Sequence, residues 1–142
     1  MDCFDGPSVA VTNSIIWGNT APGGREISVR NPVTTLAIAY SDVAGDQTEV
    51  LVDGGGTINW GVGNIDADPC FVDPNREDFH LKSQAGRWDP NSQAWVQDDV
   101  TSSCIDAGDP NSSLAFEPYP NGGIINMGAY GGTGEAGKSP SG

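Results

Sequence analysis

Basic residues are scarce in this sequence. Only 6 Lys and Arg stand against 19 Asp and Glu among 142 residues, which gives a formal net charge of −13. A nucleic-acid-binding protein needs basic clusters that displace the counterions of phosphates, and no such cluster is present. Nucleic-acid binding is therefore excluded. No apolar run approaches the roughly 18 residues that cross a bilayer, so we also expect no membrane insertion.

Cysteines are few and are not spaced for metal or redox chemistry. Cys3, Cys70 and Cys104 form neither a zinc pattern nor a Cys-x-x-Cys motif. At most one disulfide can form within the chain. A bridge between Cys70 and Cys104 is one alternative, and small buried thiols are the other, which the usual burial of free cysteine favours.

Leucine is rare, whereas β-branched residues are common. The chain has 4 Leu against 20 Val and Ile, and its apolar residues alternate in short runs bounded by Gly, Pro, Asn or Asp. Turn clusters such as Gly23-Gly24 separate the runs. The sequence therefore predicts an all-β protein. The alternating runs are residues 9–11, 27–29, 36–40, 50–52 and 79–81.

An internal repeat organises the first half of the chain. An offset of 27 residues places residues 8–18 over 35–45, and a further offset lands on 63–71. A period of this length with several short strands is typical of one coil of a parallel β-solenoid. An antiparallel sandwich with a fortuitous repeat is the alternative, because turn signals every 8–12 residues also suit a sandwich. The solenoid predicts two stacked apolar columns, Val11, Ile38, Ile65 and Ile16, Val43, Cys70.

Several segments, taken in order, resemble a known family. They are residues 11–19 (VTNSIIWGN), 38–43 (IAYSDV), 63–74 (GNIDADPCFVDP), 79–83 (FHLKS), 103–110 (SCIDAGDP) and 125–130 (INMGAY). Together they resemble the C-terminal end of secreted bacterial right-handed parallel β-helix repeat proteins. The resemblance covers nearly the whole chain, and it is specific for an architecture rather than for a function.

The resemblance implies both a fold and a location. It implies a right-handed parallel β-helix (solenoid) of about three coils with an irregular C-terminal cap. Residues 1–85 would form the coils, residues 86–134 a capping insertion and cap of the same domain, and residues 135–142 a linker or tail. It also implies an extracellular or cell-surface protein, in which such a tail leads to a surface-anchoring module.

Acidic loops are the first candidate sites. Asp66, Asp68 and Asp73 lie close together in sequence, and Asp106-x-x-Asp109 is a similar arrangement. Such loops can ligate Ca²⁺, which takes six to eight oxygens. Aspartate before Pro or Gly also accepts backbone N–H bonds and ends strands, and this structural role is the favoured interpretation. We expect no resident cofactor, with Ca²⁺ as the alternative.

The chemistry of polysaccharide cleavage offers a second role for the same carboxylates. Glycosidases need two carboxylates about 5 to 9.5 Å apart, but 19 acidic residues will produce such pairs by chance. The basic residues that a lyase would need are scattered. The single histidine, His80, alternates with Phe79 and Leu81, so it is predicted to face solvent while those two face inward.

Aromatic residues in polar surroundings are the second group of candidates. Trp88 and Trp95 lie among Asp, Asn and Gln, and Tyr119 lies in the C-terminal segment. A flat ring beside amides suits sugar recognition. The alternative is that these rings cover the apolar end of a solenoid, which every solenoid needs.

The sequence as a whole favours a structural role. We expect a non-catalytic extracellular or cell-surface scaffold domain that also binds polysaccharide weakly through Trp88, Trp95 and Tyr119. The alternative is a fragment of a polysaccharide-degrading enzyme, either a glycoside hydrolase or a polysaccharide lyase, using the acidic cluster with or without Ca²⁺. Open strand edges before Ser8 predict self-association through the N-terminal coil.

Overall fold

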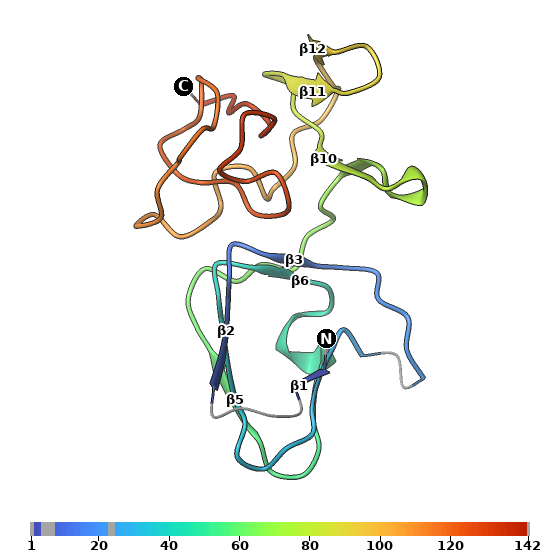
Figure 1. The fold of residues 1–142 in the computed structure, drawn as a ribbon, viewed down its shortest axis with the longest axis vertical. Helices are drawn as coiled ribbons and strands as arrows, with labels where there is room; N and C mark the ends of the chain where they lie inside the picture. The colour runs from blue at the N-terminus through green and yellow to red at the C-terminus, as the bar shows by residue number, and fades with distance from the viewer. Residues whose placement is uncertain (1, 4–7, 23–24, 142) are drawn as a thin grey trace. The chain divides into compact units, whose positions relative to one another are not determined.

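The computed structural model describes residues 2–3, 8–22 and 25–141. The chain divides into two compact units, Met1–Ala67 and Asp68–Gly142 (Figure 1). The Gly23-Gly24 turn and most of the segment before Ser8, through which self-association is predicted, lie outside the described residues.

Three small parallel sheets form the first unit. Every pairing within them joins strands that are not consecutive in the chain. A short 3-10 helix, η1 (Asp46–Glu49), precedes the last strand of the first sheet. The sheets are β1 (Asp2–Cys3) with β4 (Ile27–Val29) and β7 (Val50–Val52), β2 (Ser8–Thr12) with β5 (Thr35–Ala39) and β8 (Thr57–Trp60), and β3 (Ile15–Ile16) with β6 (Asp42–Val43).

The register of these sheets confirms the first step of the predicted repeat. Val11 pairs with Ile38, and Ile16 pairs with Val43. The second step was wrong, because Ile38 next pairs with Trp60, and Ile65 instead forms an isolated bridge with Asp42.

A shorter connection accounts for four of the five residues by which the second step, Ile38 to Trp60, is shorter than the first, Val11 to Ile38. Residues 17–26 join β3 to β4, whereas residues 44–49 join β6 to β7, so the second connection is four residues shorter. A constant offset of 27 residues therefore points to residues beyond β8, the strand that actually pairs with β5. Cys70, predicted to continue one of the columns, belongs to the second unit.

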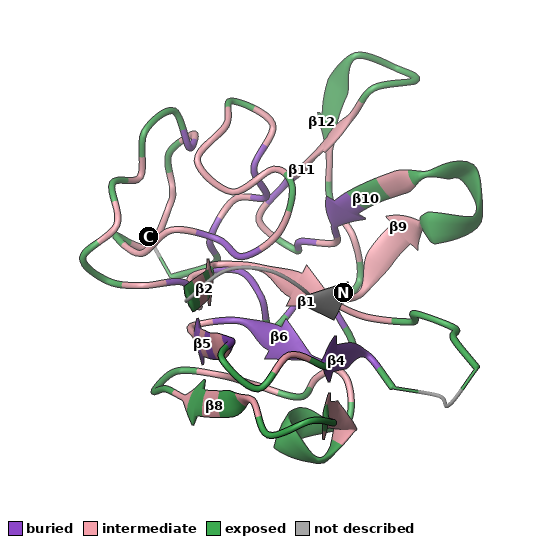
Figure 2. Ribbon diagram, turned by 60° about the horizontal axis from the view of Figure 1, so that its bottom comes forward, coloured by how far each residue is buried: buried purple, intermediate pink, exposed green. Residues whose placement is uncertain are grey.

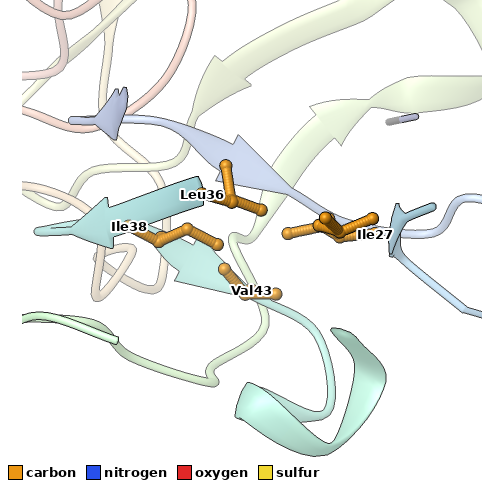
Figure 3. Close-up of a cluster of buried hydrophobic side chains, with 5 residues drawn as sticks. Ile27, Leu36, Ile38 and Val43 are labelled. Atoms are coloured by element: carbon orange, nitrogen blue, oxygen red, sulfur yellow. The ribbon is translucent and has the colours of Figure 1, made fainter. Parts of the chain in front are cut away.

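The core of the first unit lies between its three sheets. Alternation in β5 turns Leu36 and Ile38 inward, where they meet Ile27 of β4 and Val43 of β6 (Figure 3). These side chains are completely buried. Burying a side chain of this size contributes roughly 1.5–3 kcal/mol. Figure 2 shows β4 and β6 as wholly buried elements.

Two antiparallel hairpins begin the second unit. The first is β9 (Phe71–Asp73), the 3-10 helix η2 (Pro74–Arg76) and β10 (Asp78–Leu81), and the second is β11 (Arg87–Asp89) with β12 (Ala94–Val96). From residue 97 to 141 the described chain contains no helix or strand. Its turns nevertheless bury apolar side chains, namely Cys104, Ile105, Met127 and Ala136.

The predicted right-handed parallel β-helix is wrong. The described residues form five separate sheets of two or three short strands, two of them antiparallel, and no closed or solenoid sheet runs through them. The 27-residue spacing holds for one step only, and residues after Ala67 pair as local hairpins. The predicted all-β class is consistent with the structure, because the described chain forms mostly short strands and its helical segments are η1 and η2.

Residues of the segment expected to be a linker or tail make specific contacts. Ala136 and Ser139 are each 1% exposed. The backbone N–H of Lys138 donates to the Gly86 carbonyl at 2.8 Å, and that of Ser139 to the Pro120 carbonyl at 2.7 Å. This segment is therefore packed within the second unit. Across the described chain, no helix has the length and apolar character that a bilayer span requires.

Candidate functional site

The second unit contains a pocket of about 380 Å³. Its walls come from the two hairpins and from Tyr130 in the C-terminal segment. Four carboxylates and two guanidinium groups line it, so its charge is negative overall. The charged residues are Asp73, Glu77, Asp78 and Asp89 with Arg76 and Arg87.

A buried histidine forms part of the pocket wall. His80 is 2% exposed, and its ring stacks on Tyr130 with centroids 3.7 Å apart. Its Nδ1 lies 2.7 Å from Asp78 Oδ1, and its Nε2 lies 3.1 Å from Glu135 Oε2. Both ring nitrogens therefore have carboxylate partners, and the imidazole is fixed in orientation.

The predicted orientation of this strand was wrong for His80 and Phe79. His80 is buried, whereas Phe79 is 41% exposed and meets Phe71 edge-on. The register between β9 and β10 is irregular between Asp78 and Leu81, which breaks the inward–outward alternation. His80 and Leu81 are consequently both buried.

Arg87 is held at the pocket by a two-pronged ion pair with Asp98. The Arg87 Nε lies 2.9 Å from Asp98 Oδ2, and the Nη2 lies 3.1 Å from Oδ1. Both side chains are 11% exposed. The hydrogen bonds to Asp98 raise the pKa of Arg87. The guanidinium thus stays charged and keeps one position.

Asp89 is fixed by the turn of its own hairpin. Its Oδ2 accepts the Ser92 hydroxyl at 2.7 Å, and its Oδ1 accepts the Asn91 backbone N–H at 3.1 Å. The Ser92 hydrogen bond, followed by that of Asn91, lowers the pKa of Asp89. Burial raises the pKa of Tyr130, another lining residue, and the charges of Asp78 and Glu135 add to this. The pocket therefore presents an ionised carboxylate and a protonated phenol.

The two tryptophans of the second hairpin lie on its other face. Trp88 and Trp95 are opposite each other in the β11–β12 ladder, with ring centroids 5.7 Å apart. Because neighbours on a strand point to opposite faces, Trp88 points away from the side of Arg87 and Asp89. The ammonium of Lys138 lies 4.4 Å from the centroid of the Trp95 ring. The hairpin thus separates a tryptophan face from a pocket face.

A family model described as disaggregatase related matches residues 9–108, which is well over half of the chain. The chain belongs to the disaggregatase-related family. The name of this family differs from that of the β-helix repeat proteins that the sequence resembles. The family match does not contradict that resemblance. The match includes both hairpins of the pocket but ends before Tyr130 and Glu135. Searches of curated proteins and of solved structures found no match.

The aromatic residues singled out from the sequence are not part of the pocket lining. In this disaggregatase-related chain Trp88 is half-buried and Trp95 is 37% exposed. Tyr119 is 78% exposed and lies on the irregular C-terminal segment. Trp88 and Trp95 are brought together, whereas Tyr119 belongs to neither hairpin.

The predicted calcium ligands contact backbone groups and arginine. Asp66 Oδ1 accepts the Gly45 N–H at 3.0 Å, and Asp68 Oδ1 accepts the Cys70 N–H at 2.8 Å. Asp73 lies 3.7 Å from the Arg76 Nε. Within the described residues, no three or more His, Cys, Asp and Glu side chains are grouped to hold a metal ion.

Several residues of the pocket, and one that contacts its histidine, were missed by reasoning from the sequence. Asp78 and His80 are two apart on one strand, a spacing that puts both side chains on one face and could have indicated their contact. Asp89-Pro90-Asn91 has the composition of a turn that fixes its own side chains. Glu135 carries no local signal, because only the fold brings it to His80, 55 residues away.

Cys70 and Cys104 are not joined to each other. Both are described residues, and no disulfide links Cys70 to the fully buried Cys104. Burial raises the pKa of the Cys70 thiol, and the neighbouring charge of Asp68 raises it further. A thiol with a raised pKa is a weak nucleophile at neutral pH, so nothing here supports catalysis by Cys70.

Proposed function

We propose that this chain is a non-catalytic domain of an extracellular or cell-surface protein that binds a neutral polysaccharide. The observation that carries the proposal is the polar pocket of the second unit. Its volume of about 380 Å³ falls within the usual range for small-ligand sites. The resemblance to secreted bacterial proteins supports the location.

The chemistry of the pocket suits the hydroxyl groups of a sugar. Among the lining residues, Asp89 and Asn91 offer acceptors and donors, and the Tyr130 phenol offers a donor. Arg87 and Asp89 are already fixed by Asp98 and Ser92, so little side-chain freedom would be lost on binding. An anionic sugar would meet a pocket of negative overall charge, which favours a neutral ligand.

A titration with neutral oligosaccharides tests the proposal. Isothermal titration with cello-, xylo- and manno-oligosaccharides should detect binding of at least one series. Asp89→Ala should weaken that binding at least tenfold, because a buried sugar hydroxyl would lose its partner. Phe116→Ala is the matched control, since this residue is 80% exposed and lies outside the pocket lining. Absence of binding to every series would overturn the proposal.

A second variant decides which face of the hairpin holds the glycan. Trp95 is the exposed ring of the tryptophan face. If Trp95→Ala abolishes binding while Asp89→Ala does not, the site is the tryptophan face with Tyr119 as a further candidate contact. The polysaccharide-binding function would then stand, but the pocket would not be its site.

One observation supports the alternative that the chain is part of a polysaccharide-degrading enzyme. The pocket gathers Asp73, Glu77, Asp78 and Asp89, and a glycosidase needs two carboxylates in one site. Asp78 is engaged by His80, and Asp73 by Arg76. Release of reducing ends from a bound polysaccharide, lost in Glu77→Gln and Asp89→Asn, would replace the binding proposal with hydrolysis.

A further inference from the structure

Two carboxylates, the buried Glu117 and the half-buried Asp106, lie in the irregular part of the second unit, in neither hairpin. Glu117 is 8% exposed, and its Oε1 accepts the backbone N–H groups of Asn126 and Gly132, both at 2.8 Å. Asp106 Oδ2 accepts the hydroxyl of Ser139. Each carboxylate thus has one oxygen held by fixed partners.

The other oxygen of each carboxylate has no partner. Among the described residues, the buried side-chain atoms that lack a hydrogen bond are Asp106 Oδ1 and Glu117 Oε2. A buried carboxylate oxygen without a partner is strongly unfavourable, because it has lost its hydration and gained nothing in return. That both such atoms belong to this pair makes it a candidate site for a cation.

The pair also lacks a compensating positive charge. No described Lys, Arg or His side chain forms an ion pair with either carboxylate. Burial raises the pKa of Asp106, and burial together with the charge of Asp106 raises the pKa of Glu117. The two carboxylates therefore influence each other, and burial disfavours the charged form of each.

The backbone opposite Asp106 leaves room only for a glycine. Gly122 has a φ of +61°, and a Cβ atom there would lie 2.3 Å from Asp106 Oδ2 and 2.6 Å from Oδ1. Any side chain at this position would occupy the space beside the carboxylate. The chain that follows Glu117 therefore packs against the Asp106 carboxylate through the backbone of Gly122, without a side chain.

We propose that Asp106 and Glu117 bind one calcium ion through the two oxygens that lack partners. Ca²⁺ takes oxygen ligands from carboxylates, backbone carbonyls and water, and it tolerates irregular geometry. Zn²⁺ sites in proteins usually include nitrogen or sulfur ligands, and the single histidine is engaged at the pocket. The site is distinct from Asp66, Asp68 and Asp73, which contact backbone or Arg76.

Calcium titration of the full chain tests the site. After treatment with EDTA and desalting, added CaCl₂ should raise the melting temperature by on the order of 5 °C at saturating concentration, because only the folded state holds both carboxylates. Isothermal titration should give one ion per chain. MgCl₂ at the same ionic strength should give a much smaller shift, since Mg²⁺ demands near-octahedral geometry.

Two amide variants give the test its specificity. Asp106→Asn removes one charge and supplies an N–H donor for Glu117 Oε2, so the calcium-free variant should melt at or above the calcium-free parent and show no calcium response. Asp99→Asn is the matched control, because the same change at an exposed carboxylate of the same unit should leave the calcium shift intact.

Two results would overturn the proposal. The first is a parent chain that ignores calcium at neutral pH and is stabilised by mild acid, because a proton shared by the two carboxylates would then fill the role of the ion. The second is a calcium shift that survives in both Asp106→Asn and Glu117→Gln but is lost in Asp66→Asn or Asp68→Asn. That result would place the ion at the sequence-predicted cluster.

Discussion

At the scale of single residues, His80 joins segments that are far apart in the chain. Its ring nitrogens contact Asp78 on the same strand and Glu135 in the C-terminal segment, and its face covers Tyr130. Such a residue contributes through several partners at once. Its removal would leave two carboxylates without the group that orients them.

His80→Ala should therefore destabilise the chain more than Phe79→Ala. We expect a loss of about 2–3 kcal/mol in the free energy of unfolding for His80→Ala, because a buried ring and two hydrogen bonds disappear. Phe79→Ala should lose about 1 kcal/mol or less, since this ring is 41% exposed. Urea denaturation of both variants measures the difference. The reverse order would mean that Phe79, not His80, faces inward.

The burial of His80 could not be predicted from alternation alone. Phe79 and Leu81 are apolar neighbours of a polar residue, which is the usual pattern of a half-buried strand. The irregular pairing with β9 reverses this pattern, and nothing in residues 78–81 signals it. The partner Glu135 is likewise reached only through the folded chain. The pairing of Val11 with Ile38, in contrast, follows directly from the matching of two similar segments.

At the scale of elements, the segment after Gly134 contributes several contacts to the second unit. Glu135 reaches His80, Lys138 reaches Gly86 and the Trp95 ring, and Ser139 reaches Pro120. A linker would have few such contacts. The Pro and Ser residues near the end of the sequence are typical of linkers. The packing of this segment could therefore not be predicted from its composition.

Truncation after Gly134 should lower the stability of the chain measurably. Loss of these contacts should reduce the melting temperature by several degrees, on the order of 5 °C or more, and urea unfolding should show an earlier midpoint. A chain that ends at Pro140 is the control, because Ser141 is exposed. Equal stability of both truncated chains would show that the segment is a dispensable tail.

The strands themselves were predictable to different degrees. The runs of Val and Ile correctly indicated β4, β5 and β7, because apolar β-branched residues flanked by turns form strands in most surroundings. The antiparallel hairpins were missed, since the resemblance and the repeat both favoured continued parallel stacking. Asp89-Pro90-Asn91 was the local signal for one of them.

At the scale of the whole molecule, the net charge of −13 limits which glycans can bind. The long-range field of an acidic chain repels polyanions at low ionic strength and acts little on neutral polymers. The proposed ligand class is therefore set by the charge of the entire chain as well as by the pocket. Self-association through the N-terminal residues stays a prediction that size-exclusion chromatography can check.

Affinity for neutral and acidic polysaccharides should depend differently on salt. Binding of a neutral oligosaccharide should change less than about twofold between low salt and 0.5 M NaCl, because no net charge is brought together. Polygalacturonate should show no binding at low salt. Titration calorimetry at both salt concentrations gives the comparison. Tight polygalacturonate binding at low salt would contradict a neutral ligand class.

The unequal connections between the parallel strands have a practical consequence. Residues 17–26 and 44–49 link strands that pair in the same order, yet the first connection is four residues longer. The sheets thus keep their pairing whichever length the connection has, and Ala21 and Pro22 within the longer one are exposed. A foreign peptide inserted between these two residues would lie outside every strand and would not interrupt the hydrogen bonds between strands. The chain could in this way serve as a carrier that displays an epitope or an affinity tag.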